Sequence, residues 1–164
     1  MDDVHIRLAR TDDLAAINDI FNHYVAHSTC AFQLEPETLA DRAAWFAAHD
    51  EAHPVVVAEA DGGVVGWAAL SPFHTRCAYR YTVEPSIYVR QDRLGQGIGT
   101  ALLADLLERG RAAGHHSLVA LICTENAASL AMCAKAGFVE VGRLREVGYK
   151  FSRWLDVAYM QLML

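Results

Sequence analysis

One carboxylate in the middle of the chain is distinguished by its surroundings. Glu84 is the sole carboxylate between Asp61 and Asp92, and it lies in an otherwise apolar, β-rich run from Tyr81 to Val89. A carboxyl group desolvated inside such a strand has a raised pKa, which suits it to accept a proton as a general base. Glutamates more commonly lie on the surface of an edge strand, and that alternative stays open. Glu84 is the candidate catalytic residue.

A glycine-rich loop follows this run. The segment Gly95-Gln96-Gly97-Ile98-Gly99 precedes a stretch whose leucines recur at helical spacing. Glycine lets the backbone approach a ligand closely, and the unpaired N–H groups and dipole at the start of a helix favour an anion. A phosphate group is the natural ligand, although glycines also serve in plain turns. The residues around the loop therefore have to decide what it binds.

Two common phosphate-binding motifs do not fit this loop. A Walker loop needs Lys and then Ser or Thr after its last glycine, but Gly99 is followed by Thr100 and Ala101. A dinucleotide-binding Rossmann turn needs a glycine where Thr100 stands and an acidic residue at the end of the next strand, where Cys123 stands. The pattern argues against both classes.

Two arginines precede the strand that contains Glu84. Arg76 and Arg80 lie in the segment from Ser71 to Arg80, which shows neither helical nor strand periodicity. A guanidinium group binds a carboxylate or phosphinate through two parallel hydrogen bonds, so the pair predicts an anionic, amino-acid-like substrate. Two solvated surface arginines are the open alternative, because exposed arginine is common.

The composition limits the classes of protein that remain. The chain has 164 residues, of which 53% are apolar, and a formal charge of -6. Its length predicts a single domain over residues 1–164, and its charge argues against nucleic-acid and membrane-surface partners. No apolar run approaches the roughly 20 residues of a membrane span, and the chain does not begin like a signal peptide. We therefore expect a cytoplasmic protein.

No metal site is expected. The four cysteines are scattered without a Cys-x-x-Cys pair. Two histidine pairs, His23/His27 and His49/His53, have the i, i+4 spacing of metal ligands on a helix, but neither has the Glu that follows the first histidine of a zincin. They are interpreted as helix-end and surface residues.

The elements that must position these groups alternate along the chain. Periodicity predicts strands over 5–8, 55–60, 64–70, 81–89, 118–122, 138–141 and 155–164. Asp61-Gly62-Gly63 joins the second and third strands in a hairpin. Pro85 has no N–H to donate, so it predicts a bulge or a place where neighbouring strands separate.

Four helices are predicted between these strands. The first follows an N-cap segment at 11–13, and the third follows the glycine loop and closes at Gly110 or Gly114. The second starts at Pro36, ends near 53–54 and carries Leu39, Ala43 and Phe46 on one face; the fourth spans 127–136 after Asn126. This order predicts an α/β fold with a central sheet flanked by helices.

Several motifs, in this order, resemble the GCN5-related N-acetyltransferase (GNAT) superfamily. They are Val83 to Val89, Arg93 to Leu103, Asn126-Ala127-Ala128-Ser129 and Gly137-Phe138. Four further segments are similar to the subgroup of phosphinothricin and methionine sulfoximine acetyltransferases. These are Ser71-Pro72-Phe73, Ala78-Tyr79-Arg80, Thr82-Val83-Glu84 and Gly148-Tyr149-Lys150-Phe151 with Trp154-Leu155-Asp156. The resemblance covers essentially the whole chain.

The resemblance implies a mixed central sheet in which two parallel strands splay apart to hold acetyl-coenzyme A (acetyl-CoA), with the family's strand bulge at Pro85. It implies direct transfer of the acetyl group to the amine of a small amino-acid-like substrate in a ternary complex, with Glu84 as general base. The residues that it assigns to acetyl-CoA are Ile87, Tyr88 and Val89 on the strand, Leu94, Gly95, Gln96, Gly97, Ile98, Gly99 and Thr100 in the loop, and Asn126.

Further expectations follow from the same resemblance. Subgroup members are usually homodimers, and the candidate substrate-binding residues are Arg76, Arg80, Val83, Phe32, Tyr79 and Lys150. Trp154 and Asp156 are interpreted as structural. Leu94 replaces the family's Arg or Gln, so backbone N–H groups must hold the pyrophosphate, and Cys133 replaces its Tyr or His, so the general acid is unassigned.

Two alternative functions stay open. One is acetylation of another amine, such as a polyamine, an aminoglycoside or a protein N-terminus. The other is a coenzyme A-binding module without catalysis.

Overall fold

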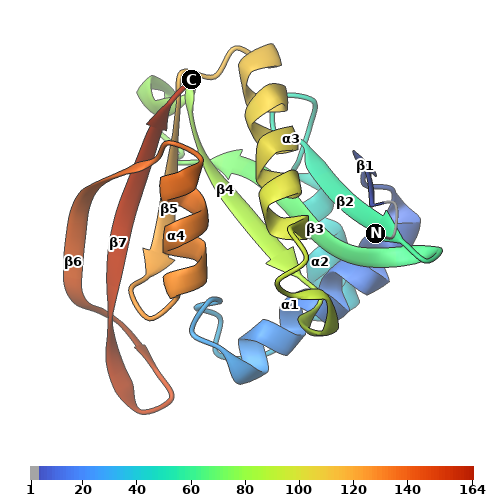
Figure 1. Ribbon diagram of the computed structural model, residues 1–164, viewed down its shortest axis with the longest axis horizontal. Helices are drawn as coiled ribbons and strands as arrows, with labels where there is room; N and C mark the ends of the chain where they lie inside the picture. The colour runs from blue at the N-terminus through green and yellow to red at the C-terminus, as the bar shows by residue number, and fades with distance from the viewer. Residues whose placement is uncertain (1–3) are drawn as a thin grey trace.

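Residues 4–164 of the computed structural model form a seven-stranded mixed sheet with helices on both faces (Figure 1). The strand order is β1-β2-β3-β4-β5-β7-β6. The strands are β1 (His5–Leu8), β2 (Val55–Ala60), β3 (Gly63–Pro72), β4 (Thr82–Val89), β5 (Ser117–Cys123), β6 (Val139–Lys150) and β7 (Arg153–Met163). The helices are α1 (Leu14–His27), α2 (Leu39–Ala47), α3 (Ile98–Ala112) and α4 (Ala127–Lys135), with short 3-10 turns η1 (Thr11–Asp13), η2 (Cys77–Tyr79) and η3 (Gln91–Arg93). The predicted order of elements is confirmed.

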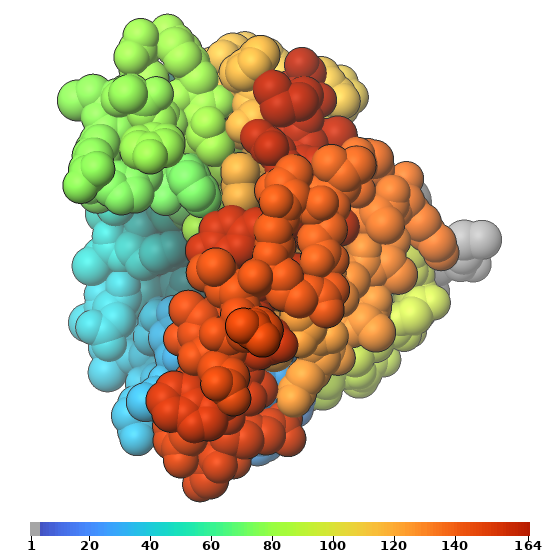
Figure 2. Space-filling view, turned by 90° about the vertical axis from the view of Figure 1, so that its left-hand side faces the viewer, coloured from blue at the N-terminus to red at the C-terminus, as the bar shows by residue number. Residues whose placement is uncertain are grey.

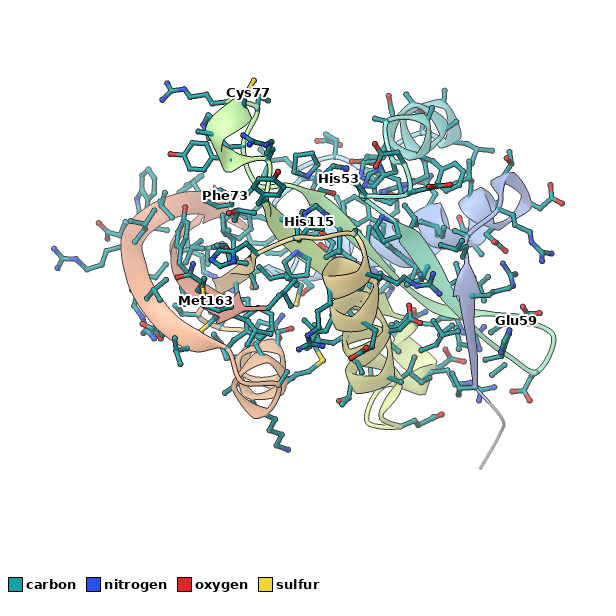
Figure 3. All side chains as sticks on the ribbon, turned by 90° about the horizontal axis from the view of Figure 1, so that it is seen from above. His53, Glu59, Phe73, Cys77, His115 and Met163 are labelled. Carbon is teal, nitrogen blue, oxygen red and sulfur yellow. The ribbon has the colours of Figure 1, made fainter. Side chains whose placement is uncertain are left out.

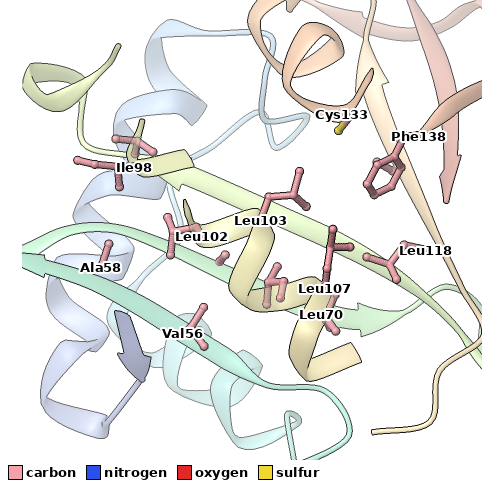
Figure 4. Packing of buried hydrophobic residues seen from close by; sticks show 14 of the residues in the cluster. Val56, Ala58, Leu70, Ile98, Leu102, Leu103, Leu107, Leu118, Cys133 and Phe138 are labelled. Atoms are coloured by element: carbon pink, nitrogen blue, oxygen red, sulfur yellow. The ribbon is translucent and has the colours of Figure 1, made fainter. Parts of the chain in front are cut away.

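Each face of the sheet has its own hydrophobic core. The α1 side packs Ile17 and Phe21 against Val57 and Trp67 of the sheet. On the other side, leucines at helical spacing on α3 cover β2, β3 and β4 (Figure 4). Burying one leucine contributes about 1.5–3 kcal/mol, so these rows fix where α3 begins relative to β4. No helix in the described part of the chain is long and apolar enough to cross a membrane.

The sheet opens between β4 and β5. These parallel strands pair only at Thr82/Ser117 and Val83/Leu118, whereas β4 pairs with β3 along its whole length. Pro85 lies two residues beyond Val83, which belongs to the last shared pair. Of the two expectations for Pro85, the separation of strands is the one observed, because the β3–β4 register runs past Pro85 without a shift.

The second helix differs from its prediction. It starts at Leu39, because Thr38 and Asp41 form a capping box in which the Thr38 side chain accepts from the Asp41 N–H. Leu39 and Ala43 are exposed, and the fully buried residue of the helix is Arg42. Of the predicted apolar face, Phe46 packs against the α1-side core, whereas the prediction for Leu39 and Ala43 was wrong; α2 also ends earlier, at Ala47.

The C-terminal hairpin is longer than predicted. Strands β6 and β7 pair through a two-residue turn, Phe151-Ser152, whose φ angles are 51° and 61°. Such turns normally carry Asn or Gly, so the sequence had no turn signal here. Within the hairpin the Asp156 Oδ1 accepts the Glu146 N–H at 2.8 Å, across a register shift of β6.

Candidate active site

Glu84 lies on the face of β4 that is turned toward α1 and α2. Side chains alternate along the strand, so Val83, Ile87 and Val89 join the α3 core while Tyr88 joins the α1 core. Glu84 is half-buried, and its carboxylate has no hydrogen bond or ion pair with any residue in the range 4–164. Burial raises the pKa of the Glu84 carboxyl group. Such a group accepts a proton at a higher pH than a solvated glutamate does.

A cavity of about 380 Å³ passes through the sheet at this point. Its lining includes residues from both faces, because β4 and β5 are no longer paired there. On the α1 side the lining includes Phe32, Trp67, Glu84 and Tyr88, and on the α3 side it includes Leu103, Asn126, Met132 and Cys133. A group on one face of the sheet can therefore meet a group on the other beside Glu84.

The backbone of β4 has free polar groups along this opening. The Arg90 N–H donates to Val65 and the Thr82 C=O accepts from Phe73, so even-numbered residues of β4 face β3. The N–H and C=O groups of Ile87 and the N–H group of Val89 consequently face the side on which β5 has separated, whereas the Val89 C=O accepts a hydrogen bond from the Tyr24 hydroxyl at 2.5 Å. A ligand lying along β4 could form hydrogen bonds with them.

Tyr88 differs from its predicted place in this set. Its backbone groups face β3, opposite Trp67, and its ring stacks on the Trp67 ring with centroids 5.0 Å apart. Because backbone groups alternate in direction along a strand, those of Ile87 and Val89 face the opening and those of Tyr88 do not.

The glycine loop forms the start of α3. Gly95 and Gly97 have φ angles of 74° and 82°, and Gly97 is the N-cap residue. No heavy atom lies within 4 Å of a Cβ built at either position, so the loop surface is open to a ligand. Gln96 and Thr100 are also exposed and Ile98 is buried. An anion placed here would meet the first N–H groups of α3, as expected.

The loop is held by an ion pair beside it. Arg93 forms an ion pair with Asp61 of the β2–β3 hairpin. The Leu94 side chain is 58% exposed. Gly99 lies close to α4, because a Cβ there would be 3.3 Å from the Met132 Sδ.

Asn126 and Cys133 contribute to the α3 side of the cavity. Asn126 caps α4: its Oδ1 accepts from the Ser129 N–H at 3.2 Å, and its Nδ2 donates to the Ser129 Oγ at 2.7 Å. Burial raises the pKa of the Cys133 thiol to about 11, so the thiol is protonated at neutral pH. The general acid stays unassigned.

The predicted substrate residues fall into three groups. Phe32 lines the cavity. Arg76, Tyr79 and Arg80 lie exposed on and beside η2, away from the sheet, as the position of Cys77 shows (Figure 3). They are absent from the described lining of the cavity.

Val83 and Lys150 are buried elsewhere in the structure. Val83 is fully buried in the α3 core. Lys150 donates its Nζ protons to the carbonyls of Ser28 at 2.9 Å and Ala31 at 2.7 Å. This places the Lys150 ammonium under the loop that carries Phe32, where it ties the β6–β7 hairpin to the end of α1.

Sequence reasoning missed the inner wall of the cavity. Arg42 is 1% exposed, and its Cζ lies 4.5 Å from the ring centroids of Phe21 and Trp45 and 5.4 Å from that of Trp67. Its Nη2 lies 2.7 Å from the Glu37 Oε2. Arginine is almost always exposed, so no sequence signal marked Arg42 as buried.

The described residues contain no group of three or more His, Cys, Asp or Glu side chains that could hold a metal ion. His49, from one of the two spaced pairs, bonds instead to the Trp45 carbonyl at 2.8 Å and the Ser71 hydroxyl at 3.1 Å.

Comparison with known proteins identifies the family. The profile of the Acetyltransferase (GNAT) family matches residues 17–138. The chain belongs to the GNAT acetyltransferases. It is 41% identical to the L-amino acid N-acyltransferase MnaT of Escherichia coli, over 97% of this chain and 93% of that protein. It is 43% identical to an L-methionine sulfoximine/L-methionine sulfone acetyltransferase of Pseudomonas paraeruginosa, over 96% of this chain and 92% of that protein.

A solved structure of the same family has the same fold. The phosphinothricin acetyltransferase from Sinorhizobium meliloti, in complex with acetyl-CoA, superposes with a TM-score of 0.95 at 36% identity, covering 98% of this chain and 88% of that one. The predicted GNAT-type sheet is confirmed.

The position of Phe32 in this acetyltransferase depends on a glycine of the C-terminal hairpin. A Cβ at Gly148 would lie 2.5 Å from the Phe32 Cε2. The substitution Gly148→Ala should therefore displace the ring and raise the KM for the amine about 10-fold, with the KM for acetyl-CoA unchanged. Steady-state kinetics measure both constants.

Gly142→Ala is the matched control, since it lies on the same strand with no heavy atom within 4 Å of its Cβ. Equal amine KM values for the two variants would mean that the Gly148–Phe32 contact does not shape the amine site.

The buried carboxylate should cost the acetyltransferase stability. The pKa of Glu84 is raised above its ordinary 4.5 on folding, so its contribution is fully present below pH 4.5 and is lost as the pH rises through the folded-state pKa. At neutral pH Glu84→Gln should raise the Tm by a few degrees, and the gain should vanish below pH 4.5. Thermal unfolding at several pH values measures this, and a lower Tm for the variant at pH 7 would contradict it.

Proposed function

We propose that this acetyltransferase transfers the acetyl group of acetyl-CoA to the amino group of a small amino-acid-like acceptor. The observation that carries the proposal is the cavity that passes between β4 and β5, with the unpaired Glu84 carboxylate on its α1 side. The acceptor class is supported by relatives named for L-amino acids, methionine sulfoximine and methionine sulfone. Both the chemistry of the cavity and the activities for which the relatives are named therefore support acetylation of an amino acid.

The residues on the α3 side fit acetyl-CoA. Ile87 and Val89 offer backbone hydrogen-bonding groups for pantetheine, and the start of α3 at Gly97 offers N–H groups for pyrophosphate. Asn126 lines the same side of the cavity. When bound there, acetyl-CoA supplies a thioester as the activated acetyl group. A free N–H on β4 would polarise its carbonyl.

Glu84 prepares the acceptor on the other side. An amine attacks a carbonyl carbon only when neutral, so the bound ammonium group must lose a proton. The half-buried Glu84 carboxylate, with its raised pKa, accepts that proton directly or through one water molecule. The neutral amine then attacks the thioester carbonyl carbon across the opening in the sheet, and the C–S bond breaks to release coenzyme A as a thiolate that takes up a proton, without a covalent enzyme intermediate.

A panel of amines tests the acceptor class. The protein would be incubated with acetyl-CoA and L-methionine sulfone, phosphinothricin, spermidine, an aminoglycoside or a peptide with a free N-terminus, and thiol release would be followed. Release with the amino acids above the rate without acceptor is the expected result. Faster release with the polyamine or peptide would overturn the acceptor class, and binding without any release would indicate a coenzyme A-binding module.

We also infer a homodimer of single-domain subunits in the cytoplasm. Strand β6 is exposed along most of its length and carries Val139, Val141, Leu144 and Val147 with exposed side chains. Figure 2 looks onto the face where the β6–β7 hairpin, in orange to red, and the η2 segment, in green, both project. Exposed apolar side chains of this kind favour association with a second copy. Light scattering should give twice the mass of one chain.

A further inference from the structure

The inner end of the cavity contains polar groups that the transfer of a proton to Glu84 does not use. They belong to Arg42 of α2 and Trp67 of β3, which both line the cavity together with Glu84. We infer that Arg42 and Trp67 bind the α-carboxylate of the amino-acid acceptor. This inference rests on the proposed function and specifies how the acceptor is recognised.

The guanidinium group of Arg42 has unused hydrogen-bonding capacity. Within residues 4–164, its Nη2 donates to the Glu37 Oε2 at 2.7 Å and its Nε to the Asn18 Oδ1 at a long 3.4 Å, and its Nη1 has no acceptor. Arginine carries five N–H donors, and donors buried as deeply as these normally find acceptors. A carboxylate in the cavity would supply one.

Trp67 provides a second, independent donor. Its side chain is 2% exposed, and its Nε1 is buried with no hydrogen-bond partner among the described residues. The Trp67 ring lies 5.4 Å from the Arg42 Cζ, so the two side chains are in contact at the same wall. Two buried donors on one cavity wall indicate an oxygen ligand with more than one lone pair.

The charges around the cavity fit a zwitterion. Glu37, Arg42 and Glu84 all line it, so carboxylates accompany the guanidinium group. An α-amino acid carries its ammonium and carboxylate groups on one carbon, and can present the first to Glu84 while the second meets Arg42. A polycation would instead place a positive charge beside Arg42.

The Tyr88 hydroxyl group is affected by the charged residues of the cavity. Burial is the main cause that raises the pKa of the Tyr88 hydroxyl group, and the charge of Cys30 raises it further. The charges of Arg42, Glu84 and Glu37 also act on this hydroxyl group. Glu84, Arg42 and Tyr88 all line the same cavity, so one small ligand can meet both charged groups.

Arg76 and Arg80 are the alternative carboxylate ligands. They are exposed, and the Arg80 side chain lies over the Tyr81 ring and donates to the Cys77 carbonyl at 3.3 Å. A desolvated guanidinium group discriminates more strongly between a carboxylate and a neutral amide than a solvated one does. The buried arginine is thus the better determinant of specificity.

The test compares L-methionine sulfone with its α-carboxamide in wild type, Arg42→Met and Trp67→Phe. We expect the ratio of kcat/KM values, acid over amide, to fall about 10- to 100-fold in Arg42→Met and about 3- to 10-fold in Trp67→Phe. The KM for acetyl-CoA should be unchanged. Where the amide reacts too slowly, its inhibition constant against the acid replaces its kcat/KM.

The controls separate recognition from packing. Arg111→Met removes an exposed arginine that pairs with Glu108 on α3, and should leave the ratio unchanged. Equal losses for acid and amide would mean that Arg42 and Trp67 act only in packing, and would overturn the inference. So would an unchanged ratio, or a fall in the ratio in Arg76→Met or Arg80→Met instead.

Two further outcomes are distinct from these. If Arg42→Met does not fold, as shown by circular dichroism, Trp67→Phe alone decides the matter, because it keeps an aromatic ring and removes only the N–H donor and part of the ring. If the wild-type enzyme acetylates no amino acid at all, the proposed function fails first. An enzyme that acetylates acid and amide equally well would retain its function but refute this binding site.

Discussion

The substitution Glu84→Gln should lower kcat about 10²- to 10⁴-fold, while the dissociation constant of acetyl-CoA stays unchanged. Glutamine has nearly the same shape but accepts no proton, so the bound ammonium group keeps its charge and cannot attack. Because Glu84 lies on the α1 side of the sheet, and Ile87 and Val89 face the opening, coenzyme binding does not depend on the carboxylate. Steady-state kinetics and calorimetry measure the two quantities.

The pH profile gives the same prediction a second readout. Only the ionised Glu84 acts as a base, and burial raises its pKa above the ordinary 4.5, so kcat/KM of the wild type should rise with pH through that raised value. In Glu84→Gln this limb should disappear, and activity should recover only where the free amine loses its own proton. A variant that keeps the wild-type limb and turnover would remove Glu84 from the mechanism.

Gly97→Val should weaken acetyl-CoA binding about 10-fold or more, as measured by calorimetry. Gly97 has a φ of 82° at the N-cap of α3, a conformation that costs a residue other than glycine of the order of 1–3 kcal/mol. Relief of that strain moves the loop and its N–H groups. No heavy atom lies within 4 Å of the Cβ position, so the effect comes from the backbone and from the ligand rather than from a clash within the protein.

Gly114→Val is the matched control for this substitution. Gly114 follows the other end of α3 with a φ of 79°, and it too has no heavy atom within 4 Å of its Cβ position. The two variants should lose similar stability, but only Gly97→Val should lose affinity for acetyl-CoA. Equal dissociation constants would show that the start of α3 does not hold the coenzyme.

Local signals were sufficient to predict much of the fold and one side of the site. Asn126, the glycines before α3 and the hairpin at Asp61-Gly62-Gly63 each act through a neighbouring backbone group, so their structural roles could be predicted from spacing. Pro85 was informative for the same reason, because a missing N–H is a local property. The functional roles assigned to these residues stay predictions.

The acceptor side could not be predicted in this way. Burial of Arg42 depends on aromatic rings from α1, α2 and β3, which are far apart in the sequence. Phe32 reaches the cavity because Gly148, on a distant hairpin, leaves space for its ring. The turn at Phe151-Ser152 adopts positive φ without glycine, so tertiary pairing of β6 with β7 overrides local preference there.

The central claim is that this enzyme moves an acetyl group from acetyl-CoA to the amine of an amino acid. It is tested most directly by mixing the purified protein with acetyl-CoA and L-methionine sulfone and measuring free thiol and N-acetylated product together. The account predicts equal amounts of the two, formed at a rate that depends on the acceptor. Thiol release without N-acetylated product, or no product from any amino acid despite tight binding of acetyl-CoA, would contradict it.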